Sequence, residues 1–299
     1  MKLCMIGTGY VGLVSGVCFA DLGNDVICVD NNLNKINLLK KGKIPIYEPG
    51  LSELVIKNYK NKRLNFSTNL KDSVIKSDII FICVGTPTKK NSNSADLSQV
   101  YTAAKEISKS IKKFKIIINK STVPVTTGDE IEKIISKKVN KKFFSVVSNP
   151  EFLREGEAIR DFIYPDRVVV GSNDSKSQRI LKSLYSPLIS KGAKFLSTKR
   201  RAAELIKYAS NAFLATKITF INEISNLFSD KTFLIMFWIH FISINLFTGG
   251  WIVKDSQKFS ISKIILIIPL IVTYLIGPLG LFIYWLIRIF YAKSINLYD

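Results

Sequence analysis

Residues 1–30 read MKLCMIGTGYVGLVSGVCFADLGNDVICVD and hold the pattern that decides the fold. A short apolar run ends in Gly7-Thr8-Gly9-Tyr10-Val11-Gly12, and a second apolar run, 26–29, ends in Asp30. This is G-x-G-x-x-G between an expected strand and an expected helix, with an acidic residue at the end of the next strand. That combination is typical of dinucleotide-binding folds, whereas the three glycines alone would be weak evidence.

Each glycine of this motif has a physical role in holding a dinucleotide. Gly7 permits a tight turn, Gly9 lets the backbone approach a pyrophosphate, and Gly12 lets the helix pack closely on the strand. Asp30 can accept hydrogen bonds from a ribose diol and would repel a 2′-phosphate, so NAD is favoured over NADP. A glycine-rich turn without a ligand is the alternative. The expected cofactor contacts in the motif, which include the N–H groups at the start of the helix, are Gly7, Gly9, Tyr10, Val11 and Gly12.

Short apolar runs alternate with longer amphipathic segments from residue 1 to about residue 150. This alternation predicts an α/β fold of the Rossmann type, a doubly wound parallel sheet covered by helices on both faces. Two further strands are expected at 167–171 and 194–197, around a helix at 175–186, and a long helical stretch follows from Arg200 to Phe228. The other expected strands are 2–6, 25–30, 64–67, 79–84, 115–119 and 144–148, and the other expected helices are 10–22, 31–41, 50–60, 69–76, 97–113 and 125–138.

Three polar loops that contain proline follow three consecutive expected strands. They are Gly85-Thr86-Pro87, Ser121-Thr122-Val123-Pro124 and Ser148-Asn149-Pro150-Glu151. The carboxyl ends of parallel strands meet at one edge of the sheet, and ligands of this fold class bind there. We therefore expect these loops to form the active-site edge.

The composition excludes several classes of protein. Of 299 residues, 47% are hydrophobic and 22% charged, so the chain is neither disordered nor fibrous. The formal charge is +20, but no arginine-rich run interleaved with aromatic residues is present, so no nucleic-acid partner is expected. All four cysteines lie within residues 1–83, in apolar stretches, and their spacing matches no zinc site. We expect buried reduced thiols and no metal.

The character of the chain changes near residue 230. Neither 232–253 nor the 24-residue stretch 264–287 contains Asp, Glu, Lys or Arg. A helix of 24 residues covers ~36 Å, enough for the ~30 Å hydrocarbon core of a bilayer. We predict a two-helix transmembrane hairpin with spans at 232–253 and 264–287, so that 232–287 contacts the lipid bilayer. A buried pair of core helices is the alternative.

At this point the motifs identify a family. Residues 1–229 resemble the N-terminal half of the UDP-glucose 6-dehydrogenases, in the UDP-glucose/GDP-mannose dehydrogenase family, which use NAD to oxidise a nucleotide-sugar alcohol to its acid. The resemblance implies NAD as cofactor and a UDP-sugar, UDP-glucose, as substrate. Sister enzymes that act on GDP-mannose and N-acetylmannosamine share the scaffold. The matching segments are 1–30, PIYEPGL (45–51), ICVGTP (82–87), KSTVPVTTGD (120–129), SNPEFLREGEAIRDFIYPDRVVVG (148–171) and RAAELIKYASNAFLATKITFINEI (201–224).

The resemblance implies catalytic roles for four residues of these motifs. Glu151 is the expected acid/base carboxylate, and Thr122 helps to position a water beside it. Lys207 is the expected oxyanion stabiliser, with Asn211 as its hydrogen-bonding companion. Positions 207 and 211 are four apart on an expected helix, so both side chains leave one face. An ammonium there can stabilise charge on the substrate oxygen during hydride loss, and a carboxylate can accept the hydroxyl proton.

The resemblance also implies further cofactor contacts. Asp30 and Lys35 are expected to hold the adenosine ribose. Thr86 and Thr122 are expected to line the nicotinamide pocket. Glu155 is expected to border the cofactor and the sugar.

Two parts of the family's machinery are missing from this sequence. The second oxidation in the family uses a cysteine thiolate in a motif resembling G-S-C-F-P-K-D, and no Cys follows residue 83. The match ends near Phe228, so we expect the nucleotide-sugar domain to be absent and the family's dimer interface to be lost. The expected domains are 1–198, the NAD-binding domain with its appended strands, and 199–229, a truncated central helix, followed by the two spans.

The tail LFTGGWIVKDSQKFSISKIILIIPLIVTYLIGPLGLFIYWLI resembles small membrane proteins related to neoxanthin-synthesis factors, through W-I-x-x-D-S and G-P-L-G-L. Three interpretations follow: incomplete NAD-dependent oxidation of UDP-glucose to UDP-glucuronate, an inactive membrane-anchored NAD-binding or interaction module, or an artefactual gene junction near 229–232. Because NAD is cytosolic, we expect a membrane-anchored protein with its NAD-binding domain in the cytoplasm. The three lysines of 249–263 do not support that orientation.

Overall fold

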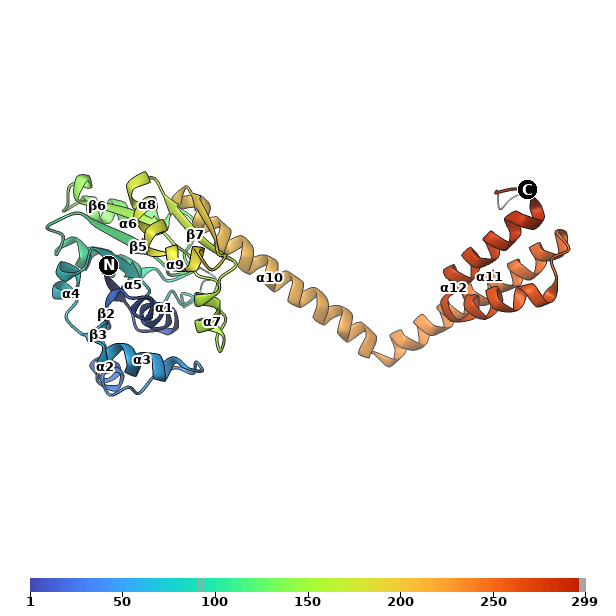
Figure 1. The fold of residues 1–299 in the computed structure, drawn as a ribbon, viewed down its shortest axis with the longest axis horizontal. Coiled ribbons are helices and arrows are strands. Elements are labelled where there is room, and N and C mark those ends of the chain that lie inside the picture. The colour runs from blue at the N-terminus through green and yellow to red at the C-terminus, as the bar shows by residue number, and fades with distance from the viewer. Residues whose placement is uncertain (91, 93, 296–299) are drawn as a thin grey trace. The chain divides into compact units, whose positions relative to one another are not determined.

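The computed structural model describes residues 1–90, 92 and 94–295. The chain divides into two compact units, Met1–Phe213 and Leu214–Asp299. Figure 1 traces both units, with the sheet in the first and the long apolar helices in the second.

The N-terminal unit is built on eight strands: β1 (Lys2–Ile6), β2 (Asp25–Val29), β3 (Leu64–Ser67), β4 (Ile79–Ile82), β5 (Lys115–Asn119), β6 (Phe144–Ser148), β7 (Arg167–Ser172) and β8 (Lys194–Thr198). Their order in the sheet is β3-β2-β1-β4-β5-β6-β7-β8. The first six pair in parallel, which confirms the predicted doubly wound Rossmann-type sheet. One pair departs from the parallel pattern, because β6 and β7 are antiparallel.

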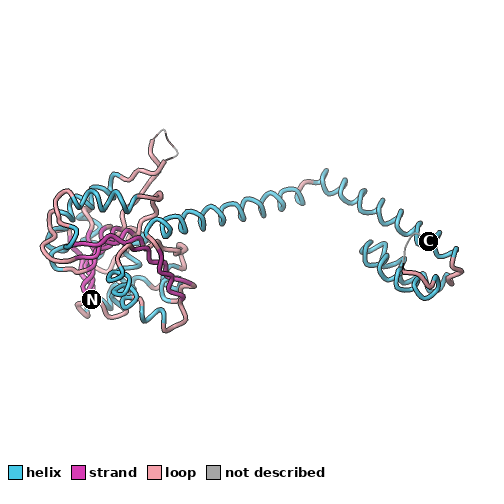
Figure 2. Tube along the Cα trace, turned by 90° about the horizontal axis from the view of Figure 1, so that it is seen from above, coloured by secondary structure: helices cyan, strands magenta, loops and turns pink. Residues whose placement is uncertain are grey.

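Helices cover both faces of this sheet (Figure 2): α1 (Tyr10–Asp21), α2 (Leu33–Lys40), α3 (Leu51–Lys60), α4 (Leu70–Lys76), α5 (Ser98–Ser108), α6 (Thr127–Ser136), α7 (Ala158–Ile163), α8 (Ser175–Leu184) and α9 (Ser186–Ile189). Side chains of β1 alternate between the two layers. Leu3 and Met5 pack in the core beneath α1, α3 and α7, whereas Cys4 and Ile6 pack in the core beneath α4, α5 and α6. The strands are therefore apolar on both faces, as buried parallel strands require.

Most expected elements are present with their ends shifted by one or two residues, and α5 is the main exception. The expected helix 97–113 ends at Ser108, whose hydroxyl donates to the Lys105 carbonyl (2.7 Å). Ile111 is the one apolar residue in 109–113, so this segment offers little to pack on the sheet. The connection between β6 and β7 also holds a short helix, α7, that the periodicity did not predict.

A continuous 30-residue helix, α10 (Arg200–Ser229), begins on the N-terminal unit. Its first turns bury Arg200, Ala203, Glu204 and Lys207. Gly171 of β7 allows this close approach, because a Cβ on Gly171 would lie 2.5 Å from the Ala203 Cβ. The packing places the predicted Lys207 at the carboxyl edge of the sheet.

The C-terminal unit contains α11 (Lys231–Lys258) and α12 (Lys263–Ala292), which lie side by side (Figure 1). Both are long and apolar enough to cross a membrane by length and composition. The stretches predicted as spans, 232–253 and 264–287, lie within these helices. The second contains a break that the sequence analysis did not predict, since Ile276 has non-helical φ −144° and ψ 67°.

Candidate functional site

Two glycines of the turn after β1, Gly7 and Gly12, could not be replaced without displacing the backbone around them. Gly7 has φ +101°, in the left-handed region, and its N–H donates to the Val29 carbonyl (2.7 Å). A Cβ on Gly7 would lie 2.6 Å from the Cys83 carbonyl oxygen. A Cβ on Gly12 would overlap the Gly7 carbonyl oxygen. The glycine loop therefore packs backbone to backbone against β4 and α1.

The space above this loop suits a pyrophosphate. A Cβ on Gly9 would meet no atom of the chain within 4 Å. Gly9 caps α1 in an extended conformation, and no side chain of the described residues caps that end. The N–H groups of Tyr10 and Val11 are thus left for an anion, as expected at a helix N-terminus.

Asp30 directly follows β2 and lies beside the glycine loop. Its Oδ2 accepts hydrogen bonds from the Thr8 N–H (3.0 Å) and hydroxyl (2.7 Å), and its Oδ1 accepts one from the Asn32 N–H (2.9 Å). Burial alone would raise the pKa of this carboxyl, but the hydrogen bonds and Lys35 outweigh it and lower the pKa. Asp30 is therefore ionised at neutral pH, which fits the binding of a ribose diol.

A carboxylate outside the predicted site set joins the glycine loop to the loop after β6. Glu48, only 8% exposed, accepts hydrogen bonds from the Tyr10 hydroxyl and from the N–H groups of Gly156 (3.0 Å) and Ile159 (3.1 Å). The Tyr10 hydroxyl also accepts from the Gly156 N–H (2.5 Å). Burial, together with Glu48, raises the pKa of Tyr10 to about 12. Glu48 lies in the PIYEPGL segment, so the motif was visible in the sequence but its contact was not.

The predicted acid/base pair comes together at the carboxyl edge of the sheet. The Lys207 ammonium donates to the Glu151 carboxylate (3.0 Å) and to the Glu151 backbone carbonyl (2.6 Å). Both side chains are about 10% exposed. The second carboxylate oxygen of Glu151 accepts from the Leu153 N–H (2.6 Å). A charged donor and a charged acceptor are thus held together in a largely desolvated site.

The predicted threonines lie on neighbouring loops of the same edge. The Thr86 hydroxyl donates to the Thr122 carbonyl (2.8 Å), and both residues are half-buried. This hydrogen bond ties the loop after β4 to the loop after β5.

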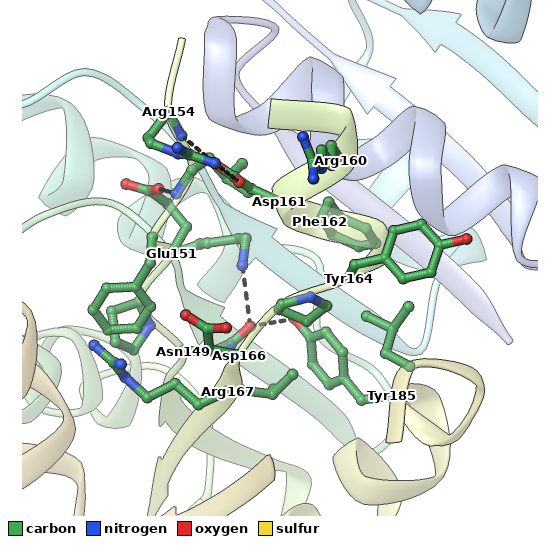
Figure 3. A pocket seen from close by; sticks show the side chains of 17 residues that line it. Asn149, Glu151, Arg154, Arg160, Asp161, Phe162, Tyr164, Asp166, Arg167 and Tyr185 are labelled. Carbon is green, nitrogen blue, oxygen red and sulfur yellow. Dashed lines mark hydrogen bonds and ion pairs between the residues drawn. The ribbon is translucent and has the colours of Figure 1, made fainter. Parts of the chain in front are cut away.

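A pocket of about 580 Å³ opens beside Glu151, between the loop after β6 and α7 (Figure 3). At its base the Asn149 side-chain oxygen accepts from the Tyr185 hydroxyl (2.5 Å) and from the Lys120 ammonium (3.4 Å). Burial lowers the pKa of Lys120 and raises that of Tyr185. Figure 3 shows Arg154 paired with Asp161 at the rim, and the Arg167 guanidinium lies over the Phe152 ring. The pocket combines basic and aromatic groups, which can hold a charged, ring-containing ligand.

The structure leaves three predicted site residues apart from this cluster. Lys35, in the first turn of α2, acts on Asp30 through its positive charge, which helps to lower the pKa of that carboxyl. Glu155 is exposed on the loop before α7, and Asn211 is exposed on α10 although Lys207, one turn earlier, is buried. Their predicted roles stay predictions.

Glu204 contacts the loops at the carboxyl edge of the sheet, and the sequence analysis did not single it out. Its carboxylate, 3% exposed, accepts hydrogen bonds from the N–H groups of Thr126 and Gly128 (both 2.8 Å) and from the Ser148 hydroxyl (3.0 Å). Burial raises its pKa in spite of these donors. Because the partners are 56 to 78 residues away in sequence, no local pattern around Glu204 indicated them.

Replacing Glu204 with Ala is expected to lower the free energy of unfolding of the N-terminal unit by about 3 kcal/mol, since three buried donors lose their acceptor. Glu223→Ala, at an exposed position of the same helix, is the matched control and should change stability by less than about 0.5 kcal/mol. Urea unfolding followed by circular dichroism measures both. Equal effects of the two substitutions would contradict the assigned role.

The ion pairs between α10 and α6 are expected to make the stability of the fold depend on pH in the acidic range. Arg200 donates to Asp129 (3.0 Å from Nε) and to Glu132 (2.6 Å). Burial opposes ionisation, but the hydrogen bonds from Arg200 prevail and lower the pKa of both carboxyls. Groups with lowered pKa stabilise the fold above their unfolded values, and this stabilisation is lost as pH falls through the folded values. Between about pH 5 and pH 2, the wild-type urea midpoint should therefore fall more steeply than that of Arg200→Ala; parallel curves would contradict this.

Comparison with known proteins agrees with this geometry. The family model described as "UDP-glucose/GDP-mannose dehydrogenase family, NAD binding domain" matches residues 1–189, and one described as "ABA DEFICIENT 4-like" matches residues 168–284. The UDP-glucose 6-dehydrogenase of Rhizobium meliloti (strain 1021) is 55% identical over 229 residues, which are 76% of this chain and 52% of that protein. UDP-glucose 6-dehydrogenase TuaD of Bacillus subtilis (strain 168) is 51% identical over 227 residues, 76% of this chain and 48% of that protein.

Solved structures give the same result. A ternary complex of GDP-mannose dehydrogenase from Pseudomonas aeruginosa has a TM-score of 0.73 and 38% identity, over 76% of this chain and 53% of that one. A UDP-glucose dehydrogenase from Pyrobaculum islandicum has a TM-score of 0.71 and 41% identity, over 74% of this chain and 51% of that one. The chain spans about half the length of the curated relatives it matches. Since the first family model covers well over half of the chain, and the sheet order and glycine loop agree with it, the chain belongs to the UDP-glucose/GDP-mannose dehydrogenase family and carries that family's NAD-binding domain.

Proposed function

We propose that the N-terminal unit binds NAD at the amino end of α1 and oxidises a hydroxyl of a UDP-sugar, with UDP-glucose as the substrate. The observation that carries the proposal is the Lys207–Glu151 pair, 3.0 Å apart, at the sheet edge that also bears the glycine loop. The curated relatives that match residues of this unit are named UDP-glucose 6-dehydrogenases, which supports this choice of sugar.

The chain's own residues supply proton transfer and charge stabilisation. Glu151 accepts the proton of the substrate hydroxyl, directly or through a water held by Thr122. Lys207 stabilises negative charge as it develops on the same oxygen. The dinucleotide, when bound, supplies the hydride acceptor. Because Lys207 and Glu151 pair with each other, the substrate hydroxyl must enter between them and replace their direct contact.

We infer that this chain stops at the first two-electron step. All four cysteines are buried. Burial raises the pKa of Cys18 and Cys83 to about 12 and raises the pKa of Cys4 and Cys28 as well. None of these thiols is available as the thiolate that would capture an aldehyde, so oxidation to the acid is not expected.

We further propose that α11 and α12 attach the chain to a membrane, with the NAD-binding unit on the cytoplasmic side. Their length and apolar composition support this, as do the exposed apolar side chains of Trp238, Phe247 and Ile268. An inactive, membrane-anchored NAD-binding module is the second candidate. It is favoured by the burial of all four cysteines, which leaves no reactive thiol among them.

Two measurements on the detergent-solubilised full chain separate these proposals. Titration calorimetry with NAD measures binding of the cofactor, and the absorbance of NADH after UDP-glucose is added measures oxidation. Oxidation that stops at the first step predicts one NADH for each UDP-glucose consumed, whereas oxidation to the acid would give two. NAD binding without NADH supports the inactive module. The absence of any heat on NAD addition contradicts both, and Asp30→Ala serves as the non-binding reference.

A further inference from the structure

The chain reverses direction inside α12. A Cβ on Gly280 would overlap the backbone N and the hydroxyl of Thr273. In a straight helix these residues would lie ~10 Å apart along the axis. The reversal takes place at Ile276, whose backbone is not helical, and Gly277-Pro278 follow it. We describe the two halves as α12a (263–275) and α12b (277–292).

Contacts with α11 show where each half runs. The Asn245 side chain donates to the Tyr274 carbonyl (3.1 Å), at the end of α12a. Near the far end of α11, Asp255 accepts from Tyr284 (2.7 Å) and from Arg288 (2.8 Å), both in α12b. The end of α12b therefore lies at the same end of α11 as the loop 259–262, from which α12a starts.

Neither half of α12 is long enough to cross a bilayer by itself. α12a has about 13 residues and α12b about 16, which correspond to ~20 Å and ~24 Å, below the ~30 Å hydrocarbon core. α11, with 28 residues, covers ~42 Å. Two crossings would need α12 to be straight, and a straight α12 would separate Arg288 from Asp255 by the thickness of the membrane.

We propose that α11 alone crosses the membrane, that α12 enters and leaves on the side of the loop 259–262, and that the Asp255–Arg288 pair holds it there. The inference rests on the proposed membrane association. It places the end of α12b on the side opposite to Asp230. It also differs from the two-span hairpin that the sequence predicts.

Local chemistry supports a bend within lipid. Pro278 has no backbone N–H, so the first turn of α12b contains one fewer donor that needs a hydrogen-bond partner. The Tyr274 carbonyl, whose helical donor would be the N–H that Pro278 lacks, accepts from the Asn245 side chain instead. A Cβ on Gly277 would overlap the Asn245 side-chain oxygen, so the glycine admits this contact. The exposed side chains at the bend, which include Leu275, Ile276 and Leu279, are apolar and suit hydrocarbon.

The charged residues within 232–292 gather at one end of α11 and α12. Arg288 is fully buried, Asp255 is 4% exposed, and the guanidinium lies 4.6 Å from the Phe259 ring centroid. Lys254, Lys258 and Lys263 flank the same loop, whereas 264–287 carries no charge. A paired, buried Arg near the interface is tolerated in a membrane protein, while an isolated one is costly.

The proposal can be tested on the full chain in sealed membrane vesicles. Single cysteines are introduced, and the side of the membrane from which each one can be labelled is measured. The four native thiols are buried, so a membrane-impermeant maleimide reports on Ser229→Cys, Ser260→Cys and Ile295→Cys. We expect Ser260→Cys and Ile295→Cys to be labelled from one side and Ser229→Cys from the other. Labelling of Ile295→Cys from the side of Ser229→Cys would mean two crossings and overturns the re-entrant arrangement alone. Extraction of the chain by alkaline carbonate contradicts the membrane association, and the re-entrant arrangement with it.

A charge exchange tests the role of the pair. In the Ile295→Cys background, Asp255→Arg is expected to abolish labelling from the side of the loop 259–262, and Asp255→Arg with Arg288→Asp to restore it. Lys254→Asp, an exposed charge change at the neighbouring position, should leave labelling unchanged. Unchanged labelling in Asp255→Arg alone, or no recovery in the exchanged pair, would overturn the assignment of the pair.

Discussion

Lys207→Ala is expected to lower the rate of NADH formation from UDP-glucose by about 100-fold or more, the usual cost of removing one donor to a developing oxyanion. The ammonium lies 3.0 Å from the Glu151 carboxylate, so a hydroxyl between them would contact both groups. Its positive charge is held where water has little access, since both side chains are about 10% exposed. Rapid-mixing absorbance measurements of a single turnover report this step directly.

Lys217→Ala, at an exposed position of the same helix, is the matched control and should leave the rate unchanged. The NAD affinity of Lys207→Ala should also match that of the wild type, because Lys207 does not contact the glycine loop. A variant that loses rate and NAD affinity together would indicate misfolding and would contradict a role in stabilising the oxyanion. Full activity in Lys207→Ala would contradict it as well.

Gly9→Ala and Gly12→Ala are expected to separate cofactor binding from folding. A methyl group on Gly9 meets no atom of the chain within 4 Å and the residue has φ −72°, so stability should be unchanged. The same methyl group would stand where a pyrophosphate approaches the α1 N-terminus. We expect NAD affinity to fall by about 10- to 100-fold, equivalent to ~1.4–2.8 kcal/mol.

Gly12→Ala should instead destabilise the fold, because its methyl group would overlap the Gly7 carbonyl oxygen. Overpacking of this kind costs about 1–3 kcal/mol. Calorimetric titration with NAD and thermal unfolding, run on both variants and the wild type, distinguish the two effects. If Gly9→Ala lost stability and kept its affinity, the pyrophosphate could not lie above this glycine.

The sequence alone was sufficient to predict those helices and strands that are determined by residues close to one another in the chain. Apolar runs that end in Gly7 and Asp30 predicted β1 and β2, and the alternation of apolar and amphipathic segments predicted a parallel sheet covered by helices. Lys207 and Glu151 were predicted from their motifs, although 56 residues separate them. Their contact depends on how α10 docks, which a glycine at position 171 permits.

Long-range contacts explain what the sequence did not reveal. Glu204 looks like an ordinary helical glutamate, and only the tertiary fold brings it to the start of α6. The break at Ile276 lies in a run that meets the length criterion for a membrane span. Gly277-Pro278 was visible there, but such pairs also occur in continuous membrane helices, so the reversal needed the contacts of Asp255 and Thr273 to be recognised.

The bridge that Glu48 makes between Tyr10 and Gly156 connects the dinucleotide end of the unit with the loop that carries Glu151. A contact shared by two ligand sites makes their occupancies thermodynamically reciprocal: if the first ligand strengthens this bridge, the second binds more tightly by the same factor. A ligand that orders the loop 151–157 would thus tighten the binding of the dinucleotide, and the dinucleotide would tighten the binding of that ligand by the same factor.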